Sequence, residues 1–328
     1  MPVMARASGT ASAGGWSHPA ALVTGWQARR VGDVGRWLVT GAGFLLVGWG
    51  LRDVFHTLWH PGGRGGLARP LMRVTWRTGR RARCRPWLGP LTGPLAMLVA
   101  VSVWLLMIVL GWALAYWPHM PDGFVYGSEI DPGERGAFLD AVYMSVVSLA
   151  TLGFGDIVPE DEWLRLVVPL QALVGFALIS AAVSWLLQVS PALSRRRALA
   201  VRLSLLRGTG TVSRLGDGDT SPLPLLEGLT RDLVQARVDL TQFTETYYFR
   251  DGDPATSLPT ALPVAVEVAE AAERSTRPEV CLAGELLMAA VRDFCRVVDG
   301  EFLRTGGALP DVVRAYADDH GLPSDPVR

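Results

Sequence analysis

The chain has 328 residues, of which 49% are hydrophobic, and its mean hydropathy is +0.26. Its 31 basic residues balance its 31 acidic residues, so charge alone suggests neither a nucleic-acid binder nor an enzyme for acidic substrates. The sequence also contains no nucleophile–base set, metal-ligand cluster or phosphate loop of the kinds that enzymes use. We therefore predict that the protein is not an enzyme, needs no cofactor and binds no nucleic acid.

The first 35 residues carry no signal-peptide pattern, and we expect residues 1–35 to form a disordered tail. An apolar segment then runs from Trp37 to Leu51 and resumes after Arg52 and Asp53. Read over residues 36–60, it is long enough for an additional membrane helix; read only to Leu51, it is an interfacial or re-entrant segment. We favour the spanning helix, which places the N-terminus outside the cell.

A polar group follows this segment, with Asp53, His56 and His60 at positions i, i+3 and i+7 of the expected helix. Such a group is either a metal or proton-sensing cluster or an ordinary polar cap at the membrane interface. We favour the cap.

Residues 61–90 carry eight arginines and no acidic residue. The positive-inside rule therefore predicts a basic cytoplasmic linker. Apolar residues are interleaved with arginines between Arg64 and Arg85, which fits either a short basic helix on anionic lipid headgroups or a solvated linker. Both interpretations remain open at this stage.

Two further segments are predicted to cross the membrane, at residues 91–117 and 163–189. Each is longer than the stretch of about 20 apolar residues that a bilayer requires. The loop between them is acidic, whereas Arg195, Arg196 and Arg197 follow the second span, so both ends of this pair point to the cytoplasm. We predict a multi-pass protein of the cell membrane with its C-terminal domain in the cytoplasm.

Residues 136–150 read as a short helix between these two spans. Its 15 residues make about 22 Å of helix, which is too short to cross and return. The chain must therefore come back through residues 151–156, where Gly153 and Gly155 permit backbone dihedrals closed to other residues. Non-helical backbone at membrane depth is tolerated where protein buries it or where it lines a water-filled path. A short run of inward-facing carbonyls can replace the water around a cation.

The hexapeptide Thr151–Asp156 is similar to the Thr-Val-Gly-Tyr-Gly-Asp signature of potassium channels of the two-transmembrane type. The resemblance implies a pore domain over residues 91–190, with outer helix 91–117, pore helix 136–150, filter 151–156 and inner helix 163–189. It implies that four copies form a homotetramer around one axis. Leu152 replaces the family's valine and Phe154 its tyrosine, which leaves the coordinating carbonyls in place.

Individual roles also follow from this resemblance. Potassium would be bound by the filter residues, which are Thr151, Leu152, Gly153, Phe154 and Gly155. Asp156 and Tyr143 would support the filter, and Gly175 would be a gating hinge. Gly175 has an alternative role in close helix packing. Ser180 and Ser184 lie on one helical face and either line the central cavity or bond neighbouring helices.

The remaining residues, 195–328, are expected to be a helical cytoplasmic domain, which gives an all-α membrane protein as the fold class. Within it, apolar residues at spacings of three and four from Leu226 to Tyr247 form a heptad seam. The seam fits a four-stranded coiled coil or one helix of a bundle inside each subunit, and we favour the bundle.

The sequence thus predicts a potassium channel subunit for passive transport. A weakly selective monovalent cation channel and a non-conducting scaffold or sensor with channel-like architecture are the alternatives.

Overall fold

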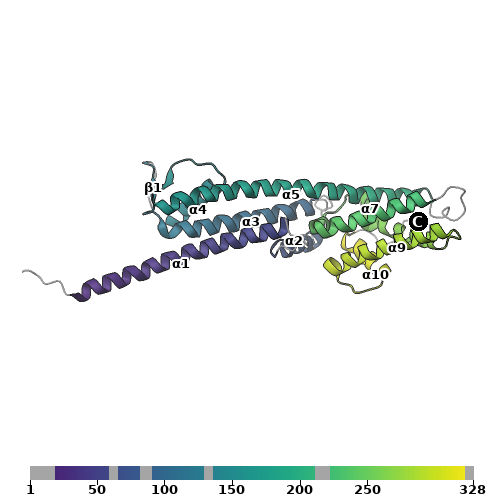
Figure 1. Cartoon of the computed structure of the whole chain (residues 1–328), viewed down its shortest axis with the longest axis horizontal. Coiled ribbons are helices and arrows are strands. Elements are labelled where there is room, and N and C mark those ends of the chain that lie inside the picture. Colours follow the sequence, from purple (N-terminus) through teal and green to yellow (C-terminus); the bar gives the residue numbers. More distant parts are fainter. Residues whose placement is uncertain (1–18, 59–65, 82–90, 129–135, 211–221, 322–328) are drawn as a thin grey trace, which may run out of the picture.

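The protein is an elongated, almost entirely helical molecule, as Figure 1 shows for a computed structural model of the whole chain. The structure describes residues 19–58, 66–81, 91–128, 136–210 and 222–321. Three long helices, α1, α3 and α5, lie lengthwise beside one another, and the C-terminal helices gather at one end. The prediction of an all-α membrane protein is confirmed, because these three helices are long and apolar enough to cross a bilayer.

Helix α1 runs from Pro19 to Leu58, and its apolar, membrane-length part is Asp33–Leu58. The structure therefore differs from the expected disordered tail over residues 19–35, whereas residues 1–18 lie outside the described part of the chain. The helix starts early because the segment opens with proline, which suits a first helical turn, and continues with good helix formers.

Helix α1 packs against α3, which spans Thr92–Tyr116. At their closest approach a Cβ on Gly43 would meet the carbonyl oxygen of Gly111. Small residues at such crossings let membrane helices approach closely. Near the far end of the pair, Thr40 Oγ1 lies 2.9 Å from His119 Nε2. The additional helix is thus a packed part of the membrane bundle.

Helix α5 runs without interruption from Glu162 to Gly208. Its 47 residues make about 70 Å of helix, more than twice the thickness of a bilayer core. The inner helix was predicted to end at residue 189, before Pro191. The structure instead carries the helix through Pro191 and through Arg195–Arg197, because these arginines bond to the C-terminal helices rather than ending the element. The predicted boundary at 195 therefore falls inside α5.

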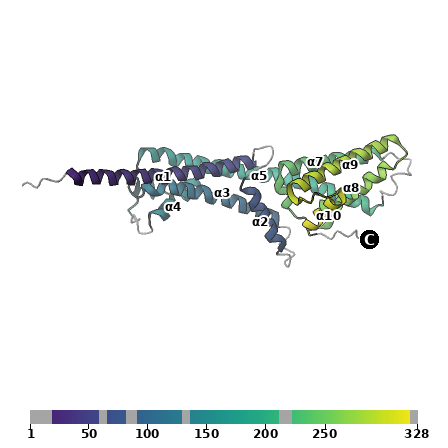
Figure 2. The same cartoon turned by 90° about the horizontal axis from the view of Figure 1, so that it is seen from below.

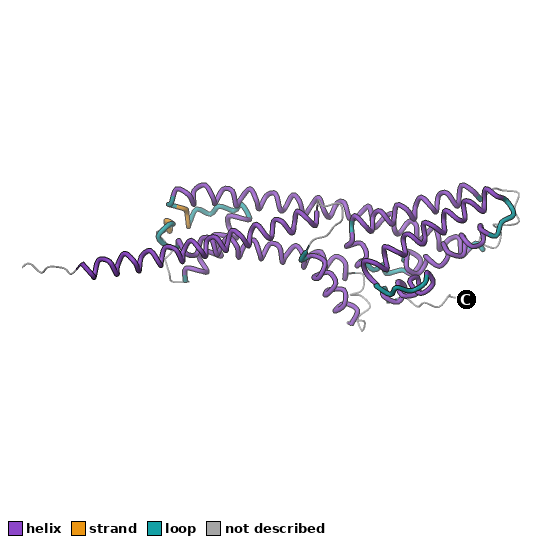
Figure 3. The backbone as a smooth tube through the Cα atoms, turned by 60° about the horizontal axis from the view of Figure 1, so that its bottom comes forward, coloured by secondary structure: helices purple, strands orange, loops and turns teal. Residues whose placement is uncertain are grey.

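A short two-stranded sheet lies at the end of the molecule opposite the C-terminal helices (Figure 3). Strand β1 (Phe124–Tyr126) pairs antiparallel with β2 (Ile157–Pro159), with Val125 opposite Val158. The 3-10 helix η2 (Trp117–His119) leads from α3 toward β1. Because β2 directly follows residues 151–156, this pairing fixes the chain where it leaves the predicted filter.

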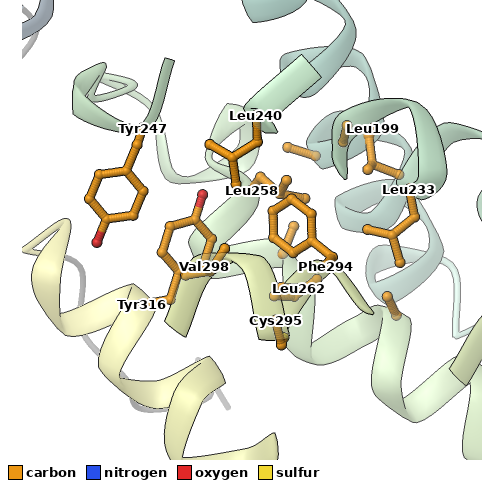
Figure 4. Close-up of a cluster of buried hydrophobic side chains, with 14 of the residues drawn as sticks. Leu199, Leu233, Leu240, Tyr247, Leu258, Leu262, Phe294, Cys295, Val298 and Tyr316 are labelled. Atoms are coloured by element: carbon orange, nitrogen blue, oxygen red, sulfur yellow. The ribbon is translucent and has the colours of Figure 1, made fainter. Parts of the chain in front are cut away.

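The C-terminal part is a helical bundle built on the end of α5. Its members are α7 (Leu223–Gln242), η3 (Thr244–Tyr248), η4 (Pro254–Thr256), α8 (Leu258–Glu273), α9 (Pro278–Val298), η5 (Asp299–Leu303) and α10 (Leu309–Asp319). The apolar positions of the heptad seam are buried inside this bundle, as Figure 4 shows for Leu233, Leu240 and Tyr247. The bundle interpretation of the seam is therefore correct, and the seam is not free to form a coiled coil between subunits.

Helix α2 (Ala68–Arg81) leaves the axis of the membrane helices at the point where they meet this bundle (Figure 2). The predicted basic helix is present over these residues. Its buried side chains, Met72 and Trp76, belong to the same core as the C-terminal helices. The apolar face of α2, for which the sequence analysis considered lipid or solvent, is therefore covered by protein. Arg64, Arg83 and Arg85 lie outside the described residues.

Candidate functional site

The candidate site is built on the short helix α4 (Ala137–Leu149) and the segment after it. Helix α4 is preceded by Gly136, whose φ of 85° is open to glycine, and its 13 residues give about 20 Å of length. It ends in a turn in which the amides of Thr151 and Leu152 donate to the carbonyls of Ser148 and Val147, at 3.0 and 2.9 Å. The chain therefore reverses direction immediately after the helix.

The segment after this turn alternates in backbone handedness. Thr151, Gly153 and Gly155 have φ values of 57°, 59° and 77°, whereas Leu152 and Phe154 lie outside the positive region. When the sign of φ alternates along the chain, consecutive peptide planes turn the same way. Backbone groups of the same kind then point toward one side of the segment. Residues 151–155 are all exposed in the single chain, with 65% of Phe154 accessible. The segment thus has the backbone pattern that a row of carbonyl ligands requires.

Asp156 anchors the end of this segment. Its carboxylate accepts a hydrogen bond of 2.5 Å from the hydroxyl of Tyr143 and one of 3.1 Å from the amide of Ile157. Its carbonyl oxygen accepts from the amide of Gly127 at 2.7 Å. The structure therefore brings the two predicted support residues together and ties them to both α4 and the small sheet.

A buried polar network that the sequence analysis missed holds α4 between the two spanning helices. Gln171 of α5 donates from Nε2 to the carbonyl oxygen of Ser145 at 2.8 Å and accepts from the hydroxyl of Tyr116 at 2.6 Å. Ser145 Oγ in turn donates to the carbonyl oxygen of Val109 at 2.9 Å. Because a buried amide requires partners, the signal available in the sequence was a glutamine near the middle of the outer half of an apolar span.

Gly175 lies against the C-terminal end of α4. A Cβ at this position would overlap the carbonyl oxygen of Leu149, so the inner helix can approach α4 only with glycine here. Helix α5 is continuous through this residue. The contact gives Gly175 a packing role, and a hinge role stays a prediction.

Ser180 and Ser184 are exposed on α5 and make local bonds. Their hydroxyls donate to the carbonyl oxygens of Phe176 and Ser180 of the same helix, at 2.9 and 2.8 Å. Neither hydroxyl is thereby bonded to a neighbouring helix of the chain. Their assignment to the lining of a cavity stays a prediction.

Asp53, from the polar group near the end of α1, is bonded to neighbouring parts of the chain. Asp53 is buried, and its two carboxylate oxygens accept from Trp104 Nε1 at 2.8 Å and from the amide of Leu67 at 3.0 Å. Among the described residues no group of three or more histidine, cysteine or acidic side chains is placed to hold a metal, and His60 lies outside them. Asp53 therefore links α1, α3 and the start of α2.

The comparison that identifies this region covers α3, α4, the segment after it and the first part of α5. Residues 99–189 match the family model described as "Ion channel". This region is similar to an ion-channel family domain. The match supports the predicted channel domain over these residues, and this family is not an enzyme family.

Two curated relatives are similar to parts of the chain. The chain is 28% identical over 177 residues to "Uncharacterized membrane protein YdjJ" of Bacillus subtilis, which covers 52% of this chain and 49% of that protein. It is 27% identical over 141 residues to "Putative potassium channel protein RPA4233" of Rhodopseudomonas palustris, which covers 43% of this chain and 30% of that protein. The chain thus spans half or less of the length of these relatives. No solved structure matches it.

Proposed function

We propose that the chain is a subunit of a potassium channel in which the backbone of residues 151–155 lines the path of the ion. The observation that carries the proposal is the alternating handedness of this exposed segment, directly after a short membrane helix. A bare cation cannot enter hydrocarbon, because its desolvation costs tens of kcal/mol. A row of carbonyl oxygens supplied by each subunit would replace its water. The name of the Rhodopseudomonas palustris relative is in keeping with this ion.

One copy of the segment cannot surround an ion, so we propose a homotetramer about a central axis. The face of α5 that follows the segment is apolar and exposed in the single chain; its members include Leu166, Leu170, Leu173, Phe176 and Ile179. Such a face requires either lipid or other subunits as cover. In this arrangement the small sheet and Asp156 lie toward the cell exterior, and the C-terminal bundle lies in the cytoplasm beyond the basic α2.

The proposal is tested by reconstituting the purified full-length protein into liposomes with opposed potassium and sodium gradients. A reversal potential close to that of potassium is the expected result. A value near zero would instead support the weakly selective cation channel. An assembled oligomer that passes no ion at any voltage or pH would support the non-conducting scaffold.

A matched pair of glycine substitutions distinguishes a specific role of residues 151–155 in ion flux from a general effect of backbone strain. Gly153→Ala should abolish flux in a protein that still assembles, because alanine resists a φ of 59° although a Cβ there would meet no atom within 4 Å. Gly136→Ala introduces the same kind of strain at a φ of 85°, also with no atom within 4 Å, but at the start of α4. It should retain flux. Equal loss in both variants would contradict the assignment of residues 151–155.

A further inference from the structure

Helix α2 is fastened to the C-terminal bundle by its buried face. Trp76 donates from Nε1 to Asp319 of α10 at 2.8 Å, and the guanidinium of Arg250 lies 4.5 Å from the centre of its ring. Arg69 forms an ion pair of 3.2 Å with Glu301 of η5. These contacts define a junction between the linker of the membrane helices and the C-terminal bundle.

The start of α2 is fastened to the membrane helices in turn. The amide of Leu67 donates to Asp53, whose other carboxylate oxygen accepts from Trp104. The ring of Trp104 lies 5.8 Å from that of Trp185 on α5. Leu67 directly precedes α2, so a displacement of α2 would also move Asp53 and Trp104. Trp104 contacts Trp185 of the inner helix, α5.

A cavity of about 10 Å³, close to the volume of one water molecule, lies inside this junction. It is bounded by the end of α1, by α2, by η3 and by η5; its lining residues are Thr57, Arg69, Met72, Arg73, Thr244, Glu245, Tyr248, Glu301 and Phe302. The cavity therefore brings together two arginines of α2 with a carboxylate of η3 and a carboxylate of η5.

Glu245 is the buried carboxylate of this cavity, with only 4% of the residue exposed. Its Oε2 atom has no hydrogen-bond partner in the described part of the chain. The facing arginines are already engaged, Arg69 by Glu301 and Arg73 by the hydroxyl of Tyr248. An ionised Glu245 would thus be buried without an ion pair, which is costly. Burial raises the pKa of Glu245 to about 7, against smaller opposing effects of its own backbone amide and of Arg69.

The other elements packed on η3 do not supply a compensating charge. Helix α3 contains no charged residue. Arg196 of α5 donates to the carbonyl of Thr246 and is paired with Asp251 at 3.0 Å. The remaining acidic groups are also engaged: Asp319 of α10 accepts from Tyr247, and Asp239 of α7 from Arg195. His320 also contacts η3, with its Nε2 atom 2.9 Å from the carbonyl oxygen of Tyr247, but burial lowers the pKa of this imidazole to about 4, so it is neutral between pH 5 and 8. Glu245 is therefore the group among these whose charge changes between pH 5 and 8.

We propose that Glu245 is a proton-binding site that keeps α2 docked on the C-terminal bundle when protonated and loosens this junction when it ionises. Glu245 binds a proton more tightly in the docked state than in an undocked state, where its carboxyl group has the pKa of an ordinary glutamate. The stability of docking therefore falls as the pH rises from about 4.5 through 7 and is constant above that range. The ratio of docked to undocked protein falls by up to about 300-fold across this window. The junction is accordingly a switch that responds to acidification below about pH 7, and it does not depend on which ion the pore conducts.

Hydrogen–deuterium exchange of the purified full-length protein at pH 5 and pH 8 tests this switch, with rates corrected for intrinsic pH dependence. Amides of α2 and η3 should exchange at least tenfold faster at pH 8 in the native chain. Glu245→Gln, which is neutral at both pH values, should remove this difference. Glu227→Gln, an exposed glutamate of α7 outside the cavity, should leave it unchanged. Equal protection of the native junction at both pH values would overturn the proposal.

A second variant keeps the test decisive if Glu245→Gln does not fold. Glu301→Gln removes the partner of Arg69, so this guanidinium becomes available to Glu245 and lowers the pKa of the docked carboxyl. The midpoint of the exchange transition should then move to lower pH and its amplitude should shrink. A purely structural role for Glu301 would change protection equally at both pH values, and that result would also overturn the proposal.

Discussion

The side chain of Gln171 joins three helices through hydrogen bonds that are shielded from solvent. It bonds Tyr116 on α3 and Ser145 on α4 from its own position on α5. We expect Gln171→Leu to destabilise the protein by about 1–3 kcal/mol, because it leaves buried donor and acceptor groups without partners. The loss should appear as a lower midpoint of thermal unfolding in detergent.

A second glutamine on the same helix provides the control for this prediction. Gln188 is exposed in the single chain, so Gln188→Leu should leave the unfolding midpoint nearly unchanged. If both variants unfold at the native temperature, the network does not hold α4 in place. Lower stability in the Gln188 variant alone would point to a contact of that residue with another subunit.

Among individual residues, the sequence predicted contacts near a known motif and missed a contact that arises only when distant helices pack together. Asp156 and Tyr143 were assigned from the resemblance to a known pore domain, and the structure places their side-chain oxygens 2.5 Å apart. Gln171 has no motif around it. Its partners are 26 and 55 positions away, so only the packing of three helices reveals its role.

At the scale of the elements, the contact between α5 and α4 depends on a residue without a side chain. A Cβ on Gly175 would overlap the backbone of Leu149, which no rotamer change can relieve. We expect Gly175→Ala to push α4 away from α5 and to lower thermal stability by a few kcal/mol, in the range of overpacked cores. Ion flux should fall with it, because Leu149 lies two residues before Thr151.

Gly48→Ala on α1 is the matched control, since a Cβ there meets no atom within 4 Å. It should be neutral or slightly stabilising because alanine favours helix. The measurement also separates packing from hinge bending. A Gly175→Ala protein of native stability whose opening alone is impaired would favour the hinge interpretation over the packing role.

The lengths of the elements show where prediction from sequence ends. Residues 91–117 and 136–150 were predicted within one residue of α3 and α4 at each end, because hydropathy and turn residues determine those ends. The end of α5 was missed by 19 residues, since the expected end was 189 and the helix stops at Gly208. Proline and a run of arginines usually end a membrane span, but here tertiary ion pairs override that local signal.

The whole molecule is held together by the arginines that follow the membrane part of α5. Arg196 is buried and bonds Asp251 at 3.0 Å and the carbonyl of Phe249 at 2.9 Å. Arg197 reaches the same carboxylate, at 2.7 Å. Because α5 is one continuous helix, these bonds fix the C-terminal bundle rigidly to the pore-forming part of the chain.

We expect Arg196→Met to loosen the bundle from α5, because removing one partner of a buried ion pair costs about 3–5 kcal/mol. Arg202→Met is the control on the same helix: the side chains of Arg202 and of its partner Asp232 are 36% and 40% exposed, so this pair should contribute far less. Limited proteolysis of both variants would measure the difference. Rapid cleavage between α5 and α7 or within residues 244–256 is expected for Arg196→Met only, with the membrane helices intact. Equal resistance in the two variants would mean that apolar packing of the bundle, rather than this buried arginine, joins the two ends of the molecule.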